Sequence, residues 1–256
     1  MSKLLEVSDL HLDFGGFKAL DGVDFDVGEA EIVGLIGPNG AGKTSLINVA
    51  SGFHPQHTGS VSFAGTSLRR LRPDQIATLG LRRTFQTSQL FAGMTVFENM
   101  VTGLHSRSKA GVLAVAFGAR QVWLEEEALM EEAWEALCFV GMQQFADRPG
   151  TALSFGQQRT VEIARTLLTN PRLIMLDEPA VGLSLPRLEE LAQLLQRIRA
   201  EKRVAFLLVE HVLKLVMNVS DRVIVMNAGQ EVAVGTPDEV TSNPRVIEIY
   251  LGKQHA

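Results

Sequence analysis

The 256-residue sequence contains one cysteine, Cys138, so an internal disulfide bond is excluded. Because Cys138 lies in the apolar stretch of residues 137–140, we expect it to be part of a hydrophobic core. Long apolar runs are also absent: the longest candidate, residues 110–119, is well short of the roughly 18 residues that suggest a membrane-spanning helix. Acidic residues interrupt the apolar positions of the N-terminus, which argues against a secretion signal. The sequence therefore predicts a chain that does not cross a bilayer.

Positive charge is scarce as well. The chain has 24 lysine and arginine residues against 29 aspartate and glutamate residues, a net charge of −5. This balance provides no global basic surface, so we expect no nucleic-acid partner. Hydrophobic residues make up 46% of the sequence, which is enough for the core of one large domain or two small ones.

The apolar patterns predict an α/β protein. Continuous or alternating apolar runs predict strands at residues 4–12, 23–27, 31–36, 61–63, 172–176, 204–209 and 222–226. Helical spacing predicts helices at residues 44–51, through Leu129, Ala133, Leu137 and Val140, and through Leu188, Leu191, Leu195 and Ile198. Fully apolar strands separated by helices indicate a parallel sheet that is covered on both faces. Residues 87–153 look mostly helical and inserted into this core.

A glycine-rich stretch, "GPNGAGKTS", separates the predicted strand at residues 31–36 from the helix that follows. Glycines let backbone N–H groups converge on one point, and the helix N-terminus favours an anion there. The spacing fits G-x-x-x-x-G-K-[ST], in which the lysine reaches the β- and γ-phosphates and the hydroxyl ligates Mg²⁺. The alternative is a glycine-rich turn that caps a helix. The candidate phosphate-binding residues are Gly37, Pro38, Asn39, Gly40, Ala41, Gly42, Lys43, Thr44 and Ser45. We expect the Lys43 side chain to be exposed.

Two carboxylates end the apolar strand in "LIMLDEP", residues 173–179. Asp177 falls at the C-terminal end of the strand, where α/β sheets place ligand groups, and it could hold Mg²⁺. Glu178 could polarise an attacking water as a general base. The alternative is an acidic surface turn before a proline.

A second candidate phosphate site lies in "LSFGQQR", residues 153–159. Ser154 and Gln157 fit a capping box, so Ser154 could simply start a helix. The same hydroxyl, the Gly156 backbone and the helix N-terminus could also bind a phosphate. Two phosphate sites in one chain suggest a nucleotide that is sandwiched between two copies.

Together these motifs resemble the nucleotide-binding subunit of an ATP-binding cassette (ABC) transporter, and the resemblance covers residues 1–256 as one ABC ATPase domain. Such a subunit has a P-loop NTPase (RecA-like) core, an N-terminal antiparallel β subdomain and an inserted α-helical subdomain. The resemblance implies that residues 1–86 and 160–256 form the core and β subdomain. Residues 87–159 would form the helical subdomain with the signature motif. Residues 37–44 match the Walker A loop, Asp177 the Walker B aspartate and Glu178 the catalytic glutamate.

The resemblance also assigns roles to residues that carry no signal alone. Residues 153–157 match the signature, which would contact the γ-phosphate bound by the opposite subunit. Gln86 would meet Mg²⁺ and water, His211 would contact the γ-phosphate, and Phe14 would stack on adenine. Otherwise Gln86 is a polar loop residue, His211 a strand-end histidine and Phe14 a core aromatic.

Two positions depart from the family pattern. Phe155 stands where the signature usually has glycine, while the serine and the second glycine are intact. Ser184 stands where an aspartate often follows the Walker B segment, so any contact that it makes across a dimer would carry no charge.

Several segments resemble the larger ATPase subunit of bacterial branched-chain amino acid importers. They include "RRTFQTSQLFAGMTVFENM" and the ending "GTPDEVTSNPRVIEIYLG". The resemblance implies ATP and Mg²⁺ as cofactors and a homodimer or a heterodimer with a related ATPase. It also implies two membrane permeases, an external solute-binding protein as an indirect partner, and the cytoplasmic face of the bacterial inner membrane. A lipid or polysaccharide exporter ATPase is an alternative. A soluble ABC ATPase is disfavoured because the chain has one cassette and no long heptad run.

An apolar cluster near Gln86 is the predicted docking surface for permeases. Some of its members are expected to belong instead to the core of the helical block. The cluster consists of Phe85, Leu90, Phe91, Met94 and Phe97.

Overall fold

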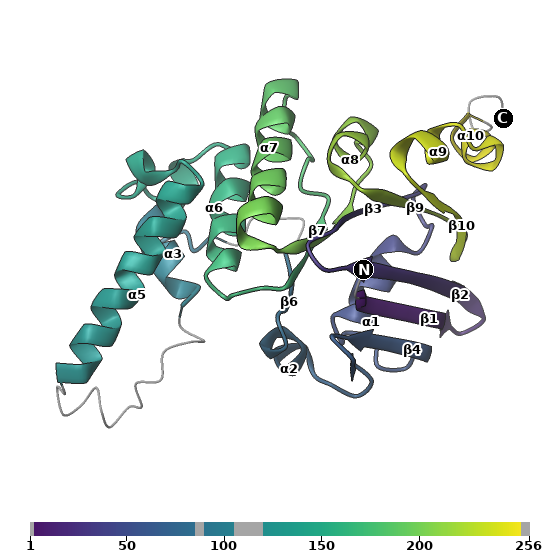
Figure 1. Ribbon diagram of the computed structural model, residues 1–256, viewed down its shortest axis with the longest axis horizontal. Helices are drawn as coiled ribbons and strands as arrows, with labels where there is room; N and C mark the ends of the chain where they lie inside the picture. Colours follow the sequence, from purple (N-terminus) through teal and green to yellow (C-terminus); the bar gives the residue numbers. More distant parts are fainter. Residues whose placement is uncertain (1–2, 85–89, 105–119, 252–256) are drawn as a thin grey trace. The chain divides into compact units, whose positions relative to one another are not determined.

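The computed structural model describes residues 3–84, 90–104 and 120–251. Backbone contacts divide the chain into two units: residues 1–86 with 172–256, and residues 87–171 (Figure 1). The second boundary falls at residue 171, whereas the sequence analysis placed it at residue 159. A boundary at 159 would divide helix α6 (Phe155–Leu167), which contacts α3 (Val96–Thr102) and α5 (Arg120–Phe139) within the second unit.

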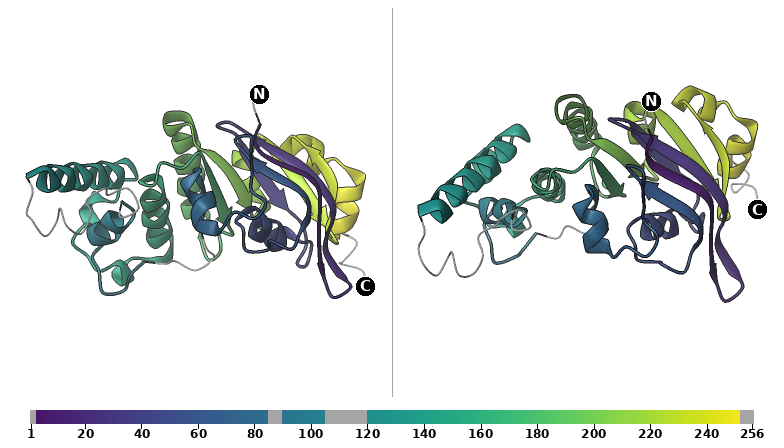
Figure 2. Two further views of the ribbon diagram at one scale, coloured as in Figure 1. Left: turned by 90° about the horizontal axis from the view of Figure 1, so that it is seen from below. Right: turned by 60° about the horizontal axis from the view of Figure 1, so that its bottom comes forward.

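An antiparallel sheet of strand order β2-β1-β4-β5 lies in the first unit, within the described residues. Its strands are β1 (Lys3–Phe14), β2 (Phe17–Gly28), β4 (Thr58–Phe63) and β5 (Thr66–Ser67). Buried apolar residues recur along β1 and β2, as expected for a sheet with one face against a core. In Figure 2, β1 and β2 are the long purple strands, which pair with each other along their length.

A second sheet of the first unit has the order β10-β9-β3-β8-β7-β6 among the described strands. All pairs are parallel except β9 with β10, which confirms the predicted parallel sheet. The strands are β3 (Ile32–Ile36), β6 (Leu81–Arg83), β7 (Leu173–Asp177), β8 (Ala205–Val209), β9 (Arg222–Asn227) and β10 (Gln230–Gly235). The helices of this unit are α1 (Lys43–Ala50), α2 (Pro73–Thr78), α7 (Leu185–Lys202), α8 (Leu213–Val219), α9 (Pro237–Thr241) and α10 (Pro244–Leu251).

The two faces of the parallel sheet are covered by different elements. Val33 and Leu35 of β3 join the apolar cluster that also contains residues of α1 and of the antiparallel sheet. The intervening Gly34 faces α8, where an added Cβ would lie 2.4 Å from Val216 Cγ1. This alternation places helices or strands on both faces, so the strands that carry the candidate site are buried.

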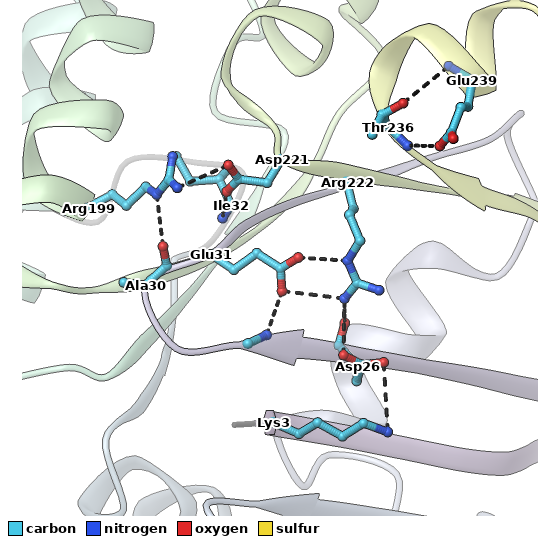
Figure 3. Close-up of polar contacts among 11 residues, drawn as sticks. Lys3, Asp26, Ala30, Glu31, Ile32, Arg199, Asp221, Arg222, Thr236 and Glu239 are labelled. Carbon is cyan, nitrogen blue, oxygen red and sulfur yellow. Dashed lines mark hydrogen bonds and ion pairs between the residues drawn. The ribbon is translucent and has the colours of Figure 1, made fainter. Parts of the chain in front are cut away.

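An ion-pair network lies at the N-terminal ends of β3 and β9 (Figure 3). Arg222 Nε donates to Glu31 Oε1 at 2.7 Å, and its Nη2 lies 3.1 Å from Asp26 Oδ2 on β2. Asp221 accepts from the backbone of Ile32 at 2.9 Å and pairs with Arg199 of α7. These contacts connect the two sheets and α7 at the sheet edge opposite the candidate site.

The second unit is helical in its described part. Apolar residues of α3, α5 and α6 form a separate buried cluster, with 3₁₀ turns at Gln143–Phe145 and Gly150–Ala152. Ala133 and Leu137 are buried on α5, and Leu129 packs against the same cluster, which confirms the predicted helix face. The prediction for Cys138 was wrong: its side chain is exposed, because it follows Leu137 by about 100° around the helix. Nowhere in the described ranges does a helix combine the length and apolar character that crossing a membrane requires.

Candidate functional site

The predicted phosphate loop connects β3 to α1, and its glycines are sterically required. Gly37 has φ 155° and Gly42 has φ 100°. An added Cβ would lie 2.2 Å from the Met226 carbonyl oxygen at Gly37 and 2.5 Å from the Ala19 carbonyl oxygen at Gly42. A side chain at either position would displace neighbouring backbone, so only glycine fits this path. The helix α1 begins directly after Gly42, with no side-chain cap.

A hollow of about 320 Å³ opens over this loop. Its size falls in the range of small-molecule sites. Its lining comes from the loop, the start of β2 and the turns that follow β7 and β8: Phe17, Ala19, Asn39, Gly40, Ala41, Gly42, Lys43, Thr44, Ser45, Glu178 and His211. The structure thus brings the phosphate loop together with Glu178 and His211, which lie far apart in the sequence.

Lys43 is buried, so the expectation of an exposed side chain was wrong. Its Nζ donates to the carbonyl oxygens of Gly37 at 2.8 Å and Pro38 at 3.0 Å, which draws the ammonium back onto its own loop. Burial lowers the pKa of Lys43, and the carboxylates of Glu178 and Asp177 oppose this change. Lys43 and Glu178 both line the hollow, so the ammonium and one of these acids face the same space.

Glu178 and His211 form a pair at the C-terminal edge of the parallel sheet. Glu178 Oε1 lies 2.9 Å from His211 Nε2, and both side chains are partly exposed. Glu178 has φ 49°, a left-handed conformation that is unfavourable for a non-glycine residue. Its backbone N–H donates to the Val209 carbonyl at 2.9 Å, so neighbouring strand β8 helps to hold this turn.

Asp177, at the end of β7, is buried beside an arginine that the sequence analysis did not single out. Asp177 Oδ2 accepts from Arg83 Nη2 at 3.0 Å, and Arg83 Nη1 donates to Asn48 Oδ1 of α1 at 2.5 Å. Asp177 Oδ1 is buried and has no hydrogen-bond partner among the described residues. Oδ2 is thus held in place by Arg83, whereas Oδ1 can still accept a hydrogen bond or coordinate a metal ion.

Glu210 is a further acid that the sequence analysis missed. It directly follows β8 and is fully buried. Its carboxylate accepts from the backbone N–H groups of Ala180, His211 and Val212. Burial raises the pKa of Glu210, and the three N–H groups act in the opposite direction. An acid at the end of an apolar strand, next to a histidine, was the available signal.

Phe14 and Phe17 lie opposite each other at the end of the β1–β2 hairpin. Phe14 is 45% exposed, and its ring meets the His54 ring edge-on at 5.3 Å between centroids. It is therefore not a core aromatic, but the residue that lines the hollow is Phe17, which is 65% exposed. The hairpin thus presents two aromatic rings where the sequence analysis expected one.

Comparisons with known proteins agree with this geometry. Residues 20–181 match the ABC transporter family, and residues 230–256 match a family described as the branched-chain amino acid ATP-binding cassette transporter. The chain belongs to the ABC transporter family.

Curated relatives of this ABC ATPase match it along nearly its whole length. It is 42% identical over 98% of both chains to the Pseudomonas aeruginosa high-affinity branched-chain amino acid transport ATP-binding protein BraF. It is 39% identical over 98% of both chains to the protein LivG, of the same description, from Escherichia coli K12.

Solved structures confirm the fold as a P-loop NTPase of the ABC type. An ATP-binding cassette of an ABC transporter in its ADP conformation matches with a TM-score of 0.84 and 36% identity, covering 98% of this chain and all of the other. A nucleotide-free cassette matches with a TM-score of 0.82 and 35% identity, covering 97% and 99% of the two chains.

The segment predicted to be the signature motif begins α6 in the second unit. Ser154 Oγ accepts from the Gln157 N–H at 3.4 Å, and Gln157 Oε1 accepts from the Ser154 N–H at 2.9 Å. The predicted capping box is therefore present, and Ser154 starts the helix. Ser154 and Phe155 are exposed, and Gly156 is partly exposed. Capping leaves this helix end accessible, so a phosphate role is compatible with it.

Gln86 and Ser184 are two further sequence-predicted positions. Gln86 lies outside the described residues. Ser184 is the exposed N-cap residue of α7, without a side-chain capping bond. Its hydroxyl therefore does not accept a hydrogen bond from a backbone N–H in the first turn of α7.

Proposed function

We propose that this ABC ATPase is the ATP-binding subunit of an importer for branched-chain or related amino acids. The match of residues 230–256 to the branched-chain family carries the proposal, because this segment lies outside the general ABC match. The full-length relatives BraF and LivG, named as branched-chain amino acid transport proteins, support it. A lipid or polysaccharide exporter is the alternative, and no described residue favours it.

The hollow over the phosphate loop would hold the triphosphate of ATP. Residues 37–45, except Pro38, would surround the phosphates with backbone N–H groups, and Lys43 would exchange its loop carbonyls for the β- and γ-phosphates. Glu178 would accept a proton from the attacking water, and His211 would contact the γ-phosphate. The 2.9 Å contact between Glu178 and His211 supports their action as one unit.

The residues at the hollow also fit Mg²⁺. Asp177 keeps one buried oxygen without a partner among the described residues, and Thr44 is exposed in the hollow lining. Mg²⁺ usually keeps several waters and is bound through one or two carboxylates together with phosphates. Thr44, Asp177 and Gln86 would hold the ion. When bound, Mg²⁺ neutralises phosphate charge.

Phe14 is the proposed platform for adenine. Its contact with His54 restrains the ring, so less conformational entropy is lost on stacking. Phe17 is its cross-strand partner and lines the hollow, so its ring would lie beside the same ligand.

The signature residues Ser154, Gly156 and Gln157 are proposed to complete the site of a partner ATPase, either a second copy or a related subunit. Their support is the accessible N-terminus of α6, a helix of 13 residues, where N–H groups and the helix dipole favour an anion. ATP would then bridge two subunits and promote dimerisation.

Replacing Ser154 with arginine is expected to abolish ATP-dependent dimerisation while leaving ATP binding to the monomer intact. The bulky cation would occupy the phosphate position of the partner's site. The test uses light scattering with and without ATP and Mg²⁺ in a Glu178→Gln background, where hydrolysis no longer dissolves the dimer. Thr236→Arg is the matched control, because Thr236 caps α9 through the same 3.4 Å capping-box bond. A dimer that persists in Ser154→Arg, alone or mixed with a related ATPase, would contradict the shared site.

The protein is further proposed to dock on membrane permeases at the cytoplasmic face of the bacterial inner membrane, with the solute-binding protein as an indirect partner. Phe91 is 53% exposed and Met94 is 37% exposed in the second unit, so both are available for contact. Leu90 and Phe97 pack partly against the core of that unit, and Phe85 lies outside the described residues. Among the described members of the cluster, the proposed docking surface thus consists of Phe91 and Met94.

Deletion of the gene is expected to abolish uptake of radiolabelled leucine, and the wild-type gene to restore it. A copy with Phe91→Glu should fail to restore uptake although its ATP affinity is normal, because the phosphate loop is untouched. Val234→Glu, a charge placed at an exposed residue of β10, is the control that should restore uptake. Leucine uptake that survives deletion would overturn the branched-chain assignment but not the ABC ATPase assignment.

A further inference from the structure

We propose that Glu210 is a positioning residue that fixes the two loops carrying Glu178 and His211 relative to each other. The inference rests on the proposed roles of Glu178 and His211. It concerns a residue that is neither at the phosphates nor in the lining of the hollow.

The carboxylate of Glu210 joins two loops with its two oxygens. Oε1 accepts from the Ala180 N–H at 2.6 Å, in the turn that follows β7. Oε2 accepts from the N–H groups of His211 at 3.0 Å and Val212 at 3.2 Å, in the turn that follows β8. Its own N–H donates to the Leu35 carbonyl of β3 at 3.3 Å. The buried side chain therefore joins the turns that follow β7 and β8, while the backbone N–H of the same residue bonds to β3.

The turn after β7, which Glu210 contacts, contains a residue in an unfavourable backbone conformation. Glu178 occupies the left-handed region at φ 49°, and such residues persist where the surrounding structure over-determines them. Ala180, two residues further on, is fixed by Glu210, and the Glu178 N–H is fixed by Val209. The same carboxylate fixes the backbone of His211, the partner of Glu178 in the 2.9 Å contact. Glu210 thus acts on both members of the pair through their backbones.

The chemistry of the site explains why a carboxylate suits this position. Three backbone donors converge on it, and a carboxylate has two oxygens that both accept. An amide has one oxygen, and its NH₂ group would face a backbone N–H of one loop or the other. Glu210→Gln therefore keeps the size of the side chain but releases one of the two loops.

Glu210→Gln is expected to lower kcat by about 100-fold, since displacing a catalytic group by about 1 Å has an effect of this order. ATP affinity, measured by calorimetry, should stay unchanged because the side-chain hydrogen bonds of Glu210 go to Ala180, His211 and Val212, and not to the phosphate loop. Glu31→Gln is the matched control: Glu31 is also buried and accepts a backbone N–H, from Gly28 at 2.6 Å, but it lies at the opposite end of β3. Its kcat should remain that of the wild type. Glu210→Asp, which keeps the charge but is shorter, should bind ATP and lose turnover to a smaller extent.

Combination with Glu178→Gln separates positioning from general destabilisation. If Glu210 acts through Glu178 and His211, adding Glu210→Gln to Glu178→Gln should produce no further loss of turnover beyond about twofold. Additive losses, or wild-type kcat in folded Glu210→Gln or Glu210→Asp protein, would overturn the inference and leave the proposed function standing. Normal turnover in Glu178→Gln alone would instead refute the proposed roles of the site. Thermal melting of each variant identifies the folded proteins to which these criteria apply.

Discussion

Replacing Glu178 with glutamine lowers ATP turnover by an expected 10²- to 10⁴-fold (about the usual effect of removing a general base) and leaves ATP binding nearly unchanged. Glutamine keeps the oxygen that faces His211 Nε2, so the shape of the site survives while the proton acceptor is lost. Phosphate release in a single turnover and calorimetric ATP affinity, measured on the same preparation, check the two halves of the prediction.

Glu201→Gln provides the control for this substitution. Glu201 is exposed at the end of α7, so the same chemical change there should leave turnover at the wild-type level. Near-normal hydrolysis in Glu178→Gln would transfer the role of general base to another residue.

Lys43→Ala should remove most of the affinity for ATP. Each hydrogen bond between the ammonium and a phosphate oxygen contributes about 1.5–3 kcal/mol, which corresponds to roughly 10- to 150-fold in affinity per bond. Because Lys43 is buried, alanine also removes packing of its aliphatic stem, and the variant must be checked for folding. Lys43→Met keeps most of that stem without the charge.

Comparing the two Lys43 variants separates charge from packing. Calorimetry should show a similar loss of ATP affinity in both, while thermal melting should show the larger loss of stability in Lys43→Ala. Lys214→Ala, at an exposed lysine of α8, should bind ATP normally. Wild-type affinity in Lys43→Met would show that the loop binds phosphate without this ammonium and would count against its assigned role.

The sheet and the phosphate loop were predictable from the sequence because their signals are local. Apolar runs mark β7, β8 and β9, and the glycine spacing at Gly37 and Gly42 reports a backbone path that no other residue fits. In α5, helical periodicity identified the buried face, and the error at Cys138 arose from reading an apolar run instead of that periodicity.

The contacts that assemble the site were not predictable, because they join residues far apart in the chain. Arg83 and Asp177 are 94 positions apart, and Glu210 reaches the backbone of Ala180 over 30 positions. Every residue except proline has a backbone N–H, so the sequence does not reveal which of these groups donates to a side chain. The burial of Lys43 was missed although its partners are near in the chain, because they are backbone carbonyl groups, which every residue has.

The ion-pair network around Arg222 has a consequence for engineering this cassette. Strand β3 has five residues, so its two ends are about 17 Å apart, roughly twice the Debye length at physiological salt. Charges exchanged at the Arg222 end, where the Arg222 and Asp26 side chains are partly exposed, are therefore largely screened from the phosphate loop. Substitutions at the Arg222 end of β3 should therefore change thermal stability without changing nucleotide affinity. Substitutions at the phosphate-loop end of β3 should change nucleotide affinity.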